Sequence, residues 1–286
     1  MNYLKVAYRF FKKAGILGYG KKKNILGMNP LLISTLFIVL TALLANAARK
    51  LVKTALNDGL MRQLLLEFIA TAELCATCFE LIIVADNFGV WVYALYLFLL
   101  TIWWGKTWEN ASACPYNIME EVAEGTQKIT TATLLILSQV LGGLVIFRYI
   151  QILWSLELTE NHRGRADEEC TADLQVPMLF GAMVEGIATC LCRLTSKFLG
   201  DTEARFASTV DSFFATMMVV AAFNFSGGYF NPALATSLKF GCEGNTAVEH
   251  MIVYWVGASV GSLLSVFIYS SKPMKNLVCR LKPKQE

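Results

Sequence analysis

Seven long apolar segments constrain what this chain of 286 residues can fold into. About 20 apolar residues span the hydrocarbon of a bilayer, where every backbone polar group must find a partner inside its own segment. Only 16% of the residues are charged, whereas soluble domains carry about a quarter. We therefore predict an all-α membrane protein without a soluble domain. The segments are 31–48, 61–84, 89–108, 130–155, 177–198, 207–225 and 249–270.

Basic residues indicate the orientation of six of these segments, because cytosolic connections carry an excess of Lys and Arg. If 61–84 begins in the cytosol, the acidic connection 157–175 lies on the opposite side. These basic flanks need no nucleic-acid partner to explain them. The cytosolic residues are then Arg49, Lys50, Lys53, Arg62, Arg193, Lys197, Arg205, Lys272, Lys275, Arg280, Lys282 and Lys284.

The segment 31–48 does not fit this alternation, because the basic residues 1–28 would lie on the wrong side. It could span the membrane against the rule, lie in the interface, or act as a signal sequence. The stretch "LLANAA" (43–48) resembles a cleavage site, but the residues before the apolar run are too many for a typical signal peptide. We favour a retained extra helix within a basic N-terminal region, 1–60.

Two pairs of landmarks share one period. "LEFIATAELC" (66–75) and "VEGIATCLC" (184–192) place Glu67 and Glu185 118 residues apart. "ACPYN" (113–117) and "FNPAL" (230–234) place Pro115 and Pro232 117 residues apart. Each unit holds three apolar segments, so the second copy must be inserted upside down. The sequence thus predicts an inverted repeat of 61–155 and 177–270, an architecture of channels and transporters.

The two X-Pro sites predict re-entrant half-helices. Proline suits the first turn of a helix, and Asn231 is a good N-cap. In an inverted pair the two N-termini meet near the midplane, where their dipoles repel cations but offer donors to a neutral solute. We expect Glu67 and Glu185 to accept hydrogen bonds from the free N–H groups of these loops. The alternatives are ordinary helix–helix hydrogen bonds or a proton relay.

At these residues the chain resembles the aquaporin superfamily. The resemblance covers about 61–270 and includes the two glutamates, "CPY", "GGYFNPALA" and "VYWVGASVGSLL" (253–264). The degenerate first motif and "ILWSLELTENH" (152–162) are similar to the unorthodox subcellular branch, the superaquaporins, which includes aquaporins eleven and twelve. The resemblance implies a passive channel for water and small neutral solutes, a homotetramer in a lipid bilayer.

The resemblance also assigns the pore motif and its departures. Cys114, Pro115 and Tyr116 match the first motif, with a weak thiol donor in place of an amide. Asn231, Pro232 and Ala233 match the second. Leu234 stands where water-selective members carry Arg. The resemblance places the remaining constriction residues at Gly228, Val219 or Val220, and Ala94 or Tyr93.

An apolar constriction of this kind favours glycerol or hydrogen peroxide alongside water, and it disfavours fast water conduction because apolar constrictions can dewet. Cys114 is expected within reach of the pore. The runner-up interpretation is a structural or interaction membrane protein that keeps the fold without conducting. A proton- or ion-coupled transporter using Glu67 and Glu185 is the third.

The remaining sequence contains no enzyme, metal or cofactor motif. The eight cysteines lie mostly in apolar segments, so we expect neither a secreted disulfide framework nor a zinc site. The tail 271–286 ends in "LKPKQE", where Lys282 and Lys284 are similar to a lysine-based retrieval signal of the endoplasmic reticulum. An intracellular membrane is therefore favoured over the plasma membrane.

Overall fold

The computed structural model describes residues 28–202 and 206–281 and contains seven helices long and apolar enough to cross a membrane. The all-α membrane fold predicted from the sequence is confirmed, and the described residues contain no β-strand. We call the side where α3 begins the inner side and the side where it ends the outer side. The spans are α2 (Pro30–Ala55), α3 (Leu60–Phe88), α4 (Val90–Thr107), α6 (Ile129–Ser155), α7 (Met178–Asp201), α8 (Ala207–Ser226) and the composite span Ala247–Tyr269.

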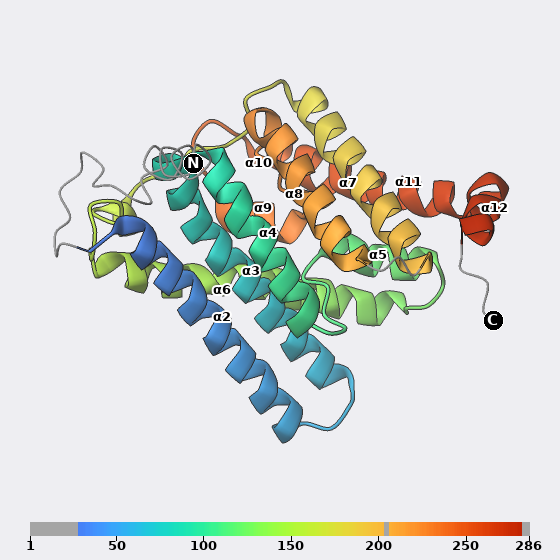
Figure 1. The fold of residues 1–286 in the computed structure, drawn as a ribbon, viewed down its shortest axis with the longest axis horizontal. Helices are drawn as coiled ribbons and strands as arrows, with labels where there is room; N and C mark the ends of the chain where they lie inside the picture. Colours follow the sequence, from blue (N-terminus) through green and yellow to red (C-terminus); the bar gives the residue numbers. More distant parts are fainter. Residues whose placement is uncertain (1–27, 203–205, 282–286) are drawn as a thin grey trace, which may run out of the picture.

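Two short helices, α5 (Pro115–Ala123) and α9 (Pro232–Lys239), lie among the long ones (Figure 1). Each begins at its proline, as expected for a residue whose missing N–H costs nothing in the first turn. The 3-10 turn η1 (Arg165–Asp167) and α12 (Lys272–Leu281) lie outside the apolar segments and were not predicted from them. Figure 1 places α12 at the edge of the molecule, beyond α11.

The last span changes its helical geometry midway. It consists of α10 (Ala247–His250), the π-helix η2 (Met251–Gly257) and α11 (Ala258–Tyr269). The π-helix carries two neighbouring aromatic side chains, one of which bonds to the end of α8 and the other to the second half-helix α9. Tyr254 donates to the carbonyl oxygen of Ser226 at 2.8 Å, and Trp255 Nε1 donates to Thr236 Oγ1 at 2.9 Å. Short π segments of this kind occur often beside functional sites.

The extra helix α2 is attached by a buried ion pair. Arg49 bonds to Glu73 of α3, and both side chains are almost inaccessible to solvent. Glu73 also accepts hydrogen bonds from the indole nitrogens of Trp103 and Trp108, each at 2.9 Å. Figure 1 shows α2 at the outside of the bundle, alongside α3 and α4. A carboxylate with three donors fixes this helix more specifically than apolar contact alone.

Small residues allow α7 and α11 to approach closely. A Cβ at Gly261 would lie 2.0 Å from the carbonyl oxygen of Gly186, and one at Gly257 would lie 2.7 Å from that of Ala182. Neither position has room for a side chain. This contact follows the small-xxx-small rule for membrane helices.

A disulfide joins Cys170 and Cys242 on the outer side, which the sequence analysis did not foresee. Cys170 lies in the connection between α6 and α7, and Cys242 follows α9. These two cysteines are outside the apolar helices, so the expectation that cysteines here serve as small apolar residues does not apply to them. Their connections meet only in the folded chain, and sequence spacing alone does not predict the pair.

Candidate functional site

The loop before α5 is held by the first repeated glutamate. Glu67 lies in α3 and is 4% exposed. Its carboxylate accepts from the backbone nitrogens of Ser112 at 2.8 Å and Ala113 at 2.9 Å. Gln139 Nε2 of α6 donates to the same carboxylate at 2.8 Å. The glutamate therefore satisfies backbone donors that the bilayer interior would otherwise leave without partners.

The loop before α9 is held in the same manner by the second glutamate. Glu185 of α7 is fully buried. It accepts from the backbone nitrogens of Tyr229 at 3.2 Å and Phe230 at 2.7 Å, and from Ser226 Oγ at 2.6 Å. Both glutamates thus bond the two residues that lead up to the X-Pro pair. The structure brings each predicted glutamate to its predicted loop.

The two loops touch at the N-terminal ends of their half-helices. Asn231 caps α9, with Oδ1 accepting from the nitrogens of Ala233 at 3.0 Å and Leu234 at 3.3 Å. Its Nδ2 donates across to the carbonyl oxygen of Ala113 at 2.8 Å. The residues preceding each cap, Ala113 and Phe230, have φ values of 51° and 45°. Left-handed backbone at non-glycine residues is uncommon and is often found at functional sites.

The first motif lacks the capping bond of the second. Cys114 stands at the N-cap of α5 without a side-chain capping bond, and it is 4% exposed. It packs with Tyr116 and Ala258 in a small buried cluster. Pro115 and Pro232 each occupy the first position of their helix. Ala233 is buried within α9. The thiol therefore contributes no strong donor at the point where the loops meet.

A cavity of about 470 Å³ opens on the outer side of this junction. Leu234 and Gly228 line it, as do the rings of Tyr93, Phe223 and Tyr229. Tyr93 and Phe223 form an edge-to-face pair between α4 and α8, with centroids 5.4 Å apart. We call this cavity of about 470 Å³ the outer cavity. Its other lining residues are Cys78, Ile82, Ala85, Asp86, Asp173, Gln175, Asn224, Gly227 and Leu238.

The outer cavity includes one of the two alternatives expected on α4, and on α8 it includes a residue that was not expected. Tyr93, not Ala94, reaches the outer cavity from α4, and Ala94 is buried in the bundle. From α8 the lining residues are Phe223, one turn beyond Val219, and Asn224. Val219 instead packs behind Gly228, whose Cβ would lie 2.7 Å from the Val219 carbonyl oxygen. The rotation of α4 and α8 decides which side chain lines the cavity, and sequence spacing does not fix it.

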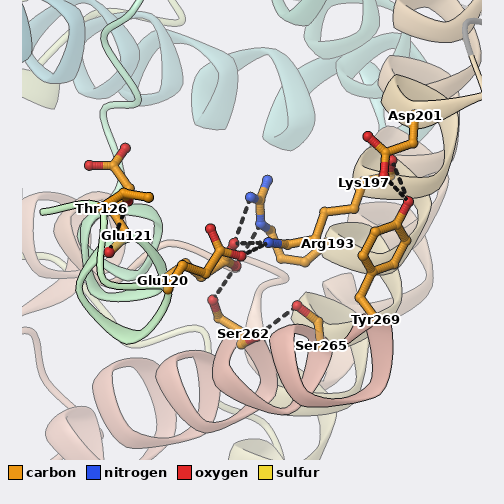
Figure 2. Close-up of polar contacts among 10 residues, drawn as sticks. Glu120, Glu121, Thr126, Arg193, Lys197, Asp201, Ser262, Ser265 and Tyr269 are labelled. Carbon is orange, nitrogen blue, oxygen red and sulfur yellow. Dashed lines mark hydrogen bonds and ion pairs between the residues drawn. The ribbon is translucent and has the colours of Figure 1, made fainter. Parts of the chain in front are cut away.

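A charged cluster that the sequence analysis missed fastens α5 on the inner side (Figure 2). Glu120 is 2% exposed and accepts two bonds of 2.8 Å from Arg193 of α7. Lys197 approaches it at 3.1 Å, and Ser262 of α11 donates to it. Burial raises the pKa of Glu120, but these cationic and hydroxyl donors outweigh burial and hold that pKa below its usual range. Glu120 therefore stays ionised and ties three helices together.

The predicted retrieval residues, Lys282 and Lys284, lie outside the described residues. Within the described part of the chain, no group of three or more His, Cys, Asp or Glu is placed to hold a metal ion.

A bundle of membrane-spanning helices in which two half-helices meet end to end defines a channel-type membrane protein. Comparison with known proteins agrees, although no protein-family model matches the chain. Aquaporin-11 of Milnesium tardigradum is 30% identical over 258 residues, covering 89% of this chain and 92% of the relative. Aquaporin-12 of Mus musculus is 28% identical over 85% of this chain and 86% of its own length. Human Aquaporin-11 is 27% identical over 80% of this chain and 85% of its own.

Among solved structures, an aquaglyceroporin from Plasmodium falciparum matches with a TM-score of 0.48 and 13% identity, over 87% of this chain and 97% of that one. The chain belongs to the aquaporin superfamily, in the branch of aquaporins 11 and 12. It is an integral, multi-pass membrane channel, and not an enzyme.

Proposed function

We propose that the chain is a passive channel for water and small neutral solutes, glycerol and hydrogen peroxide among them, in an intracellular membrane. The observation that carries the proposal is the junction of the two half-helices, where Asn231 bonds to Ala113 beneath the outer cavity. Aligned peptide dipoles place positive ends at this junction, which repels cations and offers hydrogen-bond donors to an uncharged solute.

Leu234 favours neutral solutes larger than water. It lines the outer cavity at the position where the resemblance places Arg in water-selective members. An isobutyl side chain offers neither the charge nor the donors of a guanidinium. With Tyr93 and Phe223 it makes the wall largely apolar, which suits the carbon backbone of a polyol and slows water.

Flux measurements on reconstituted protein test this function. We would compare osmotic water, glycerol and hydrogen peroxide permeability in proteoliposomes with those of empty vesicles. Asn231→Asp replaces the amide donor with a carboxylate facing the Ala113 carbonyl oxygen, and flux is expected to fall to background. Asn276→Asp makes the same chemical change on the exposed helix α12 and is expected to leave flux unchanged.

Absence of flux for all three solutes, with the protein folded and inserted, would contradict conduction. That result would favour the alternative of a structural membrane protein that retains the fold.

Two features support the orientation that we expect in the endoplasmic reticulum, with the outer side in the lumen. The Cys170–Cys242 disulfide lies on the outer side, which an oxidising lumen would maintain. The basic residues gather on the inner side, which we assign to the cytosol. If Lys282 and Lys284 act in retrieval, changing both to Ala moves the protein to the cell surface, whereas Lys272→Ala with Lys275→Ala does not. Unchanged retention in the first variant would contradict retrieval through Lys282 and Lys284.

We further propose that residues 61–270 form the channel domain as an inverted repeat, and that the channel is a homotetramer. The repeated Glu67 and Glu185 contacts support the first point. Family analogy supports the second, and native mass spectrometry of the purified protein tests it.

A further inference from the structure

The outer cavity takes part of its wall from the connection between α6 and α7. Asp173 and Gln175 of this connection line the cavity together with Tyr229, which lies two residues before Asn231. We call residues 170–175 the outer collar. None of its residues belongs to the two pore motifs or the constriction positions, and the proposed function gives it no role in conduction.

The outer collar is fastened to the second half-helix at several points. The Cys170–Cys242 disulfide joins it to the residues after α9. The backbone nitrogen of Ala172 donates to the carbonyl oxygen of Glu243 at 2.8 Å. The backbone nitrogen of Glu243 in turn donates to the carbonyl oxygen of Cys170 at 3.0 Å. Lys239 Nζ, at the end of α9, donates to the Thr171 carbonyl oxygen at 2.9 Å. The collar and α9 therefore form one rigid unit.

Asp173 is the side chain that this unit presents to Tyr229. One carboxylate oxygen lies 2.9 Å from Nζ of Lys239, which is buried, and the other accepts from the Tyr229 hydroxyl. Burial, together with the neighbouring Asp173 carboxylate, raises the pKa of Tyr229 well above its ordinary value. The hydroxyl thus remains protonated and remains a donor. Hydrogen bonds to an ionised acceptor are stronger than those between neutral groups.

Tyr229 is consequently held at three places. Its backbone nitrogen bonds to Glu185, its hydroxyl bonds to Asp173, and its ring packs edge-on against Tyr254 with centroids 5.4 Å apart. The ring lines the same cavity as Leu234 and the Tyr93–Phe223 pair. Because three rings line this cavity, the width of its opening depends on where each ring is fixed.

We infer that Asp173 is a positioning residue that sets the size selectivity of the outer mouth by fixing the ring of Tyr229. This inference rests on the proposed function, because selectivity has meaning only if the channel conducts. Lys239 holds the half-buried Asp173 carboxylate in place by its charge, and the disulfide holds the collar in register with α9. Released from Asp173, the Tyr229 ring can move aside and admit a larger solute.

The test is the ratio of erythritol to glycerol permeability in proteoliposomes, which does not depend on how much protein is inserted. Tyr229→Phe removes only the hydroxyl and keeps the ring. Asp173→Asn keeps the shape but weakens the acceptor. Since the lost bond has a charged acceptor, each variant is expected to raise the ratio by about threefold or more. The double variant is expected to match either single one, because both break the same contact.

Tyr269→Phe is the matched control. Its hydroxyl donates to Asp201 at 2.7 Å on the inner side, so the change removes the same kind of bond far from the cavity and leaves the ratio unchanged (Figure 2). An unchanged or lower ratio in Tyr229→Phe, in a protein that conducts glycerol, overturns the inference and leaves the channel function standing. Wild-type flux no higher than that of empty vesicles overturns both. Asp173→Asn leaves Lys239 without its full ion pair. If Asp173→Asn fails to fold for this reason, Tyr229→Phe alone decides the outcome.

Discussion

The side-chain nitrogen of Asn231 donates to the carbonyl oxygen of Ala113 at 2.8 Å, across 118 residues of sequence. This one bond joins the loops of the two half-helices at their N-terminal ends. Each loop is in turn held by a buried glutamate of a long helix. A continuous series of hydrogen bonds therefore runs through the centre of the molecule. It leads from Glu67 to Ala113, from Ala113 to Asn231, and through the loop that precedes Asn231 to Glu185. Apolar helices surround this series of bonds.

Glu67→Gln and Glu185→Gln test this series of bonds. A neutral amide accepts more weakly and presents its own NH2 to backbone donors, so each change is expected to cost about 2–4 kcal/mol of unfolding free energy. Glycerol flux is expected to fall as well. Thermal unfolding in detergent measures the loss, with Glu169→Gln on the exposed connection as the control. A melting temperature equal to wild type in both variants would mean that the loops do not depend on these carboxylates.

The attachment of α2 is tested by Arg49→Met. The change leaves Glu73 buried without its cation, which is expected to cost about 3–5 kcal/mol. The double variant Arg49→Met, Glu73→Gln is expected to be more stable than the single one, because it removes the unpaired buried charge and its amide oxygen still accepts from one of the two indoles, Trp103 or Trp108. Proteolysis in the connection 56–59 reports release of α2. If the double variant is the less stable of the two, the ion pair does not govern α2.

The long helices and the X-Pro half-helices could be predicted from the sequence, because a bilayer leaves few ways for backbone N–H and C=O groups to form hydrogen bonds. Glu67 and Glu185 followed because a buried carboxylate in an apolar helix needs donors close by. Phe223 did not follow, and Tyr93 was only one of two alternatives, since the rotation of α8 and α4 is set by packing. Nor did Asp173 or the Cys170–Cys242 pair, whose positions depend on how a connection of irregular backbone crosses the outer side.

Thiol modification distinguishes the cysteines along the channel. Cys78 lines the outer cavity, whereas Cys114 is packed against Tyr116 and Ala258. A methanethiosulfonate reagent applied from the outer side is therefore expected to reduce glycerol flux by reacting with Cys78. Cys78→Ser should abolish the inhibition, and Cys114→Ser should preserve it. Protection by Cys114→Ser alone would place the reactive thiol at the junction of the half-helices instead.

The contact between α7 and α11 predicts that the same substitution, Gly to Ala, has different effects at two glycines. Gly261→Ala forces a methyl group into the Gly186 carbonyl oxygen and is expected to destabilise the fold by about 1–3 kcal/mol or more. Gly200→Ala, in α7 with nothing within 4 Å of the new methyl group, is expected to be neutral or slightly stabilising. Melting temperatures in one detergent compare them directly. Equal effects would show that this helix contact is looser than described.

The disulfide predicts a response to reductant that depends on only two of the eight cysteines. Cys170→Ser with Cys242→Ser removes the link between the outer collar and α9, and is expected to lower the unfolding free energy by about 2–4 kcal/mol. Reductant should shift the melting temperature of wild type to that of the double variant and leave the variant itself unchanged. A shift of the same size in the double variant would assign the effect to another thiol. Because the collar carries Asp173, reduction is also expected to raise the erythritol-to-glycerol ratio, as Tyr229→Phe does.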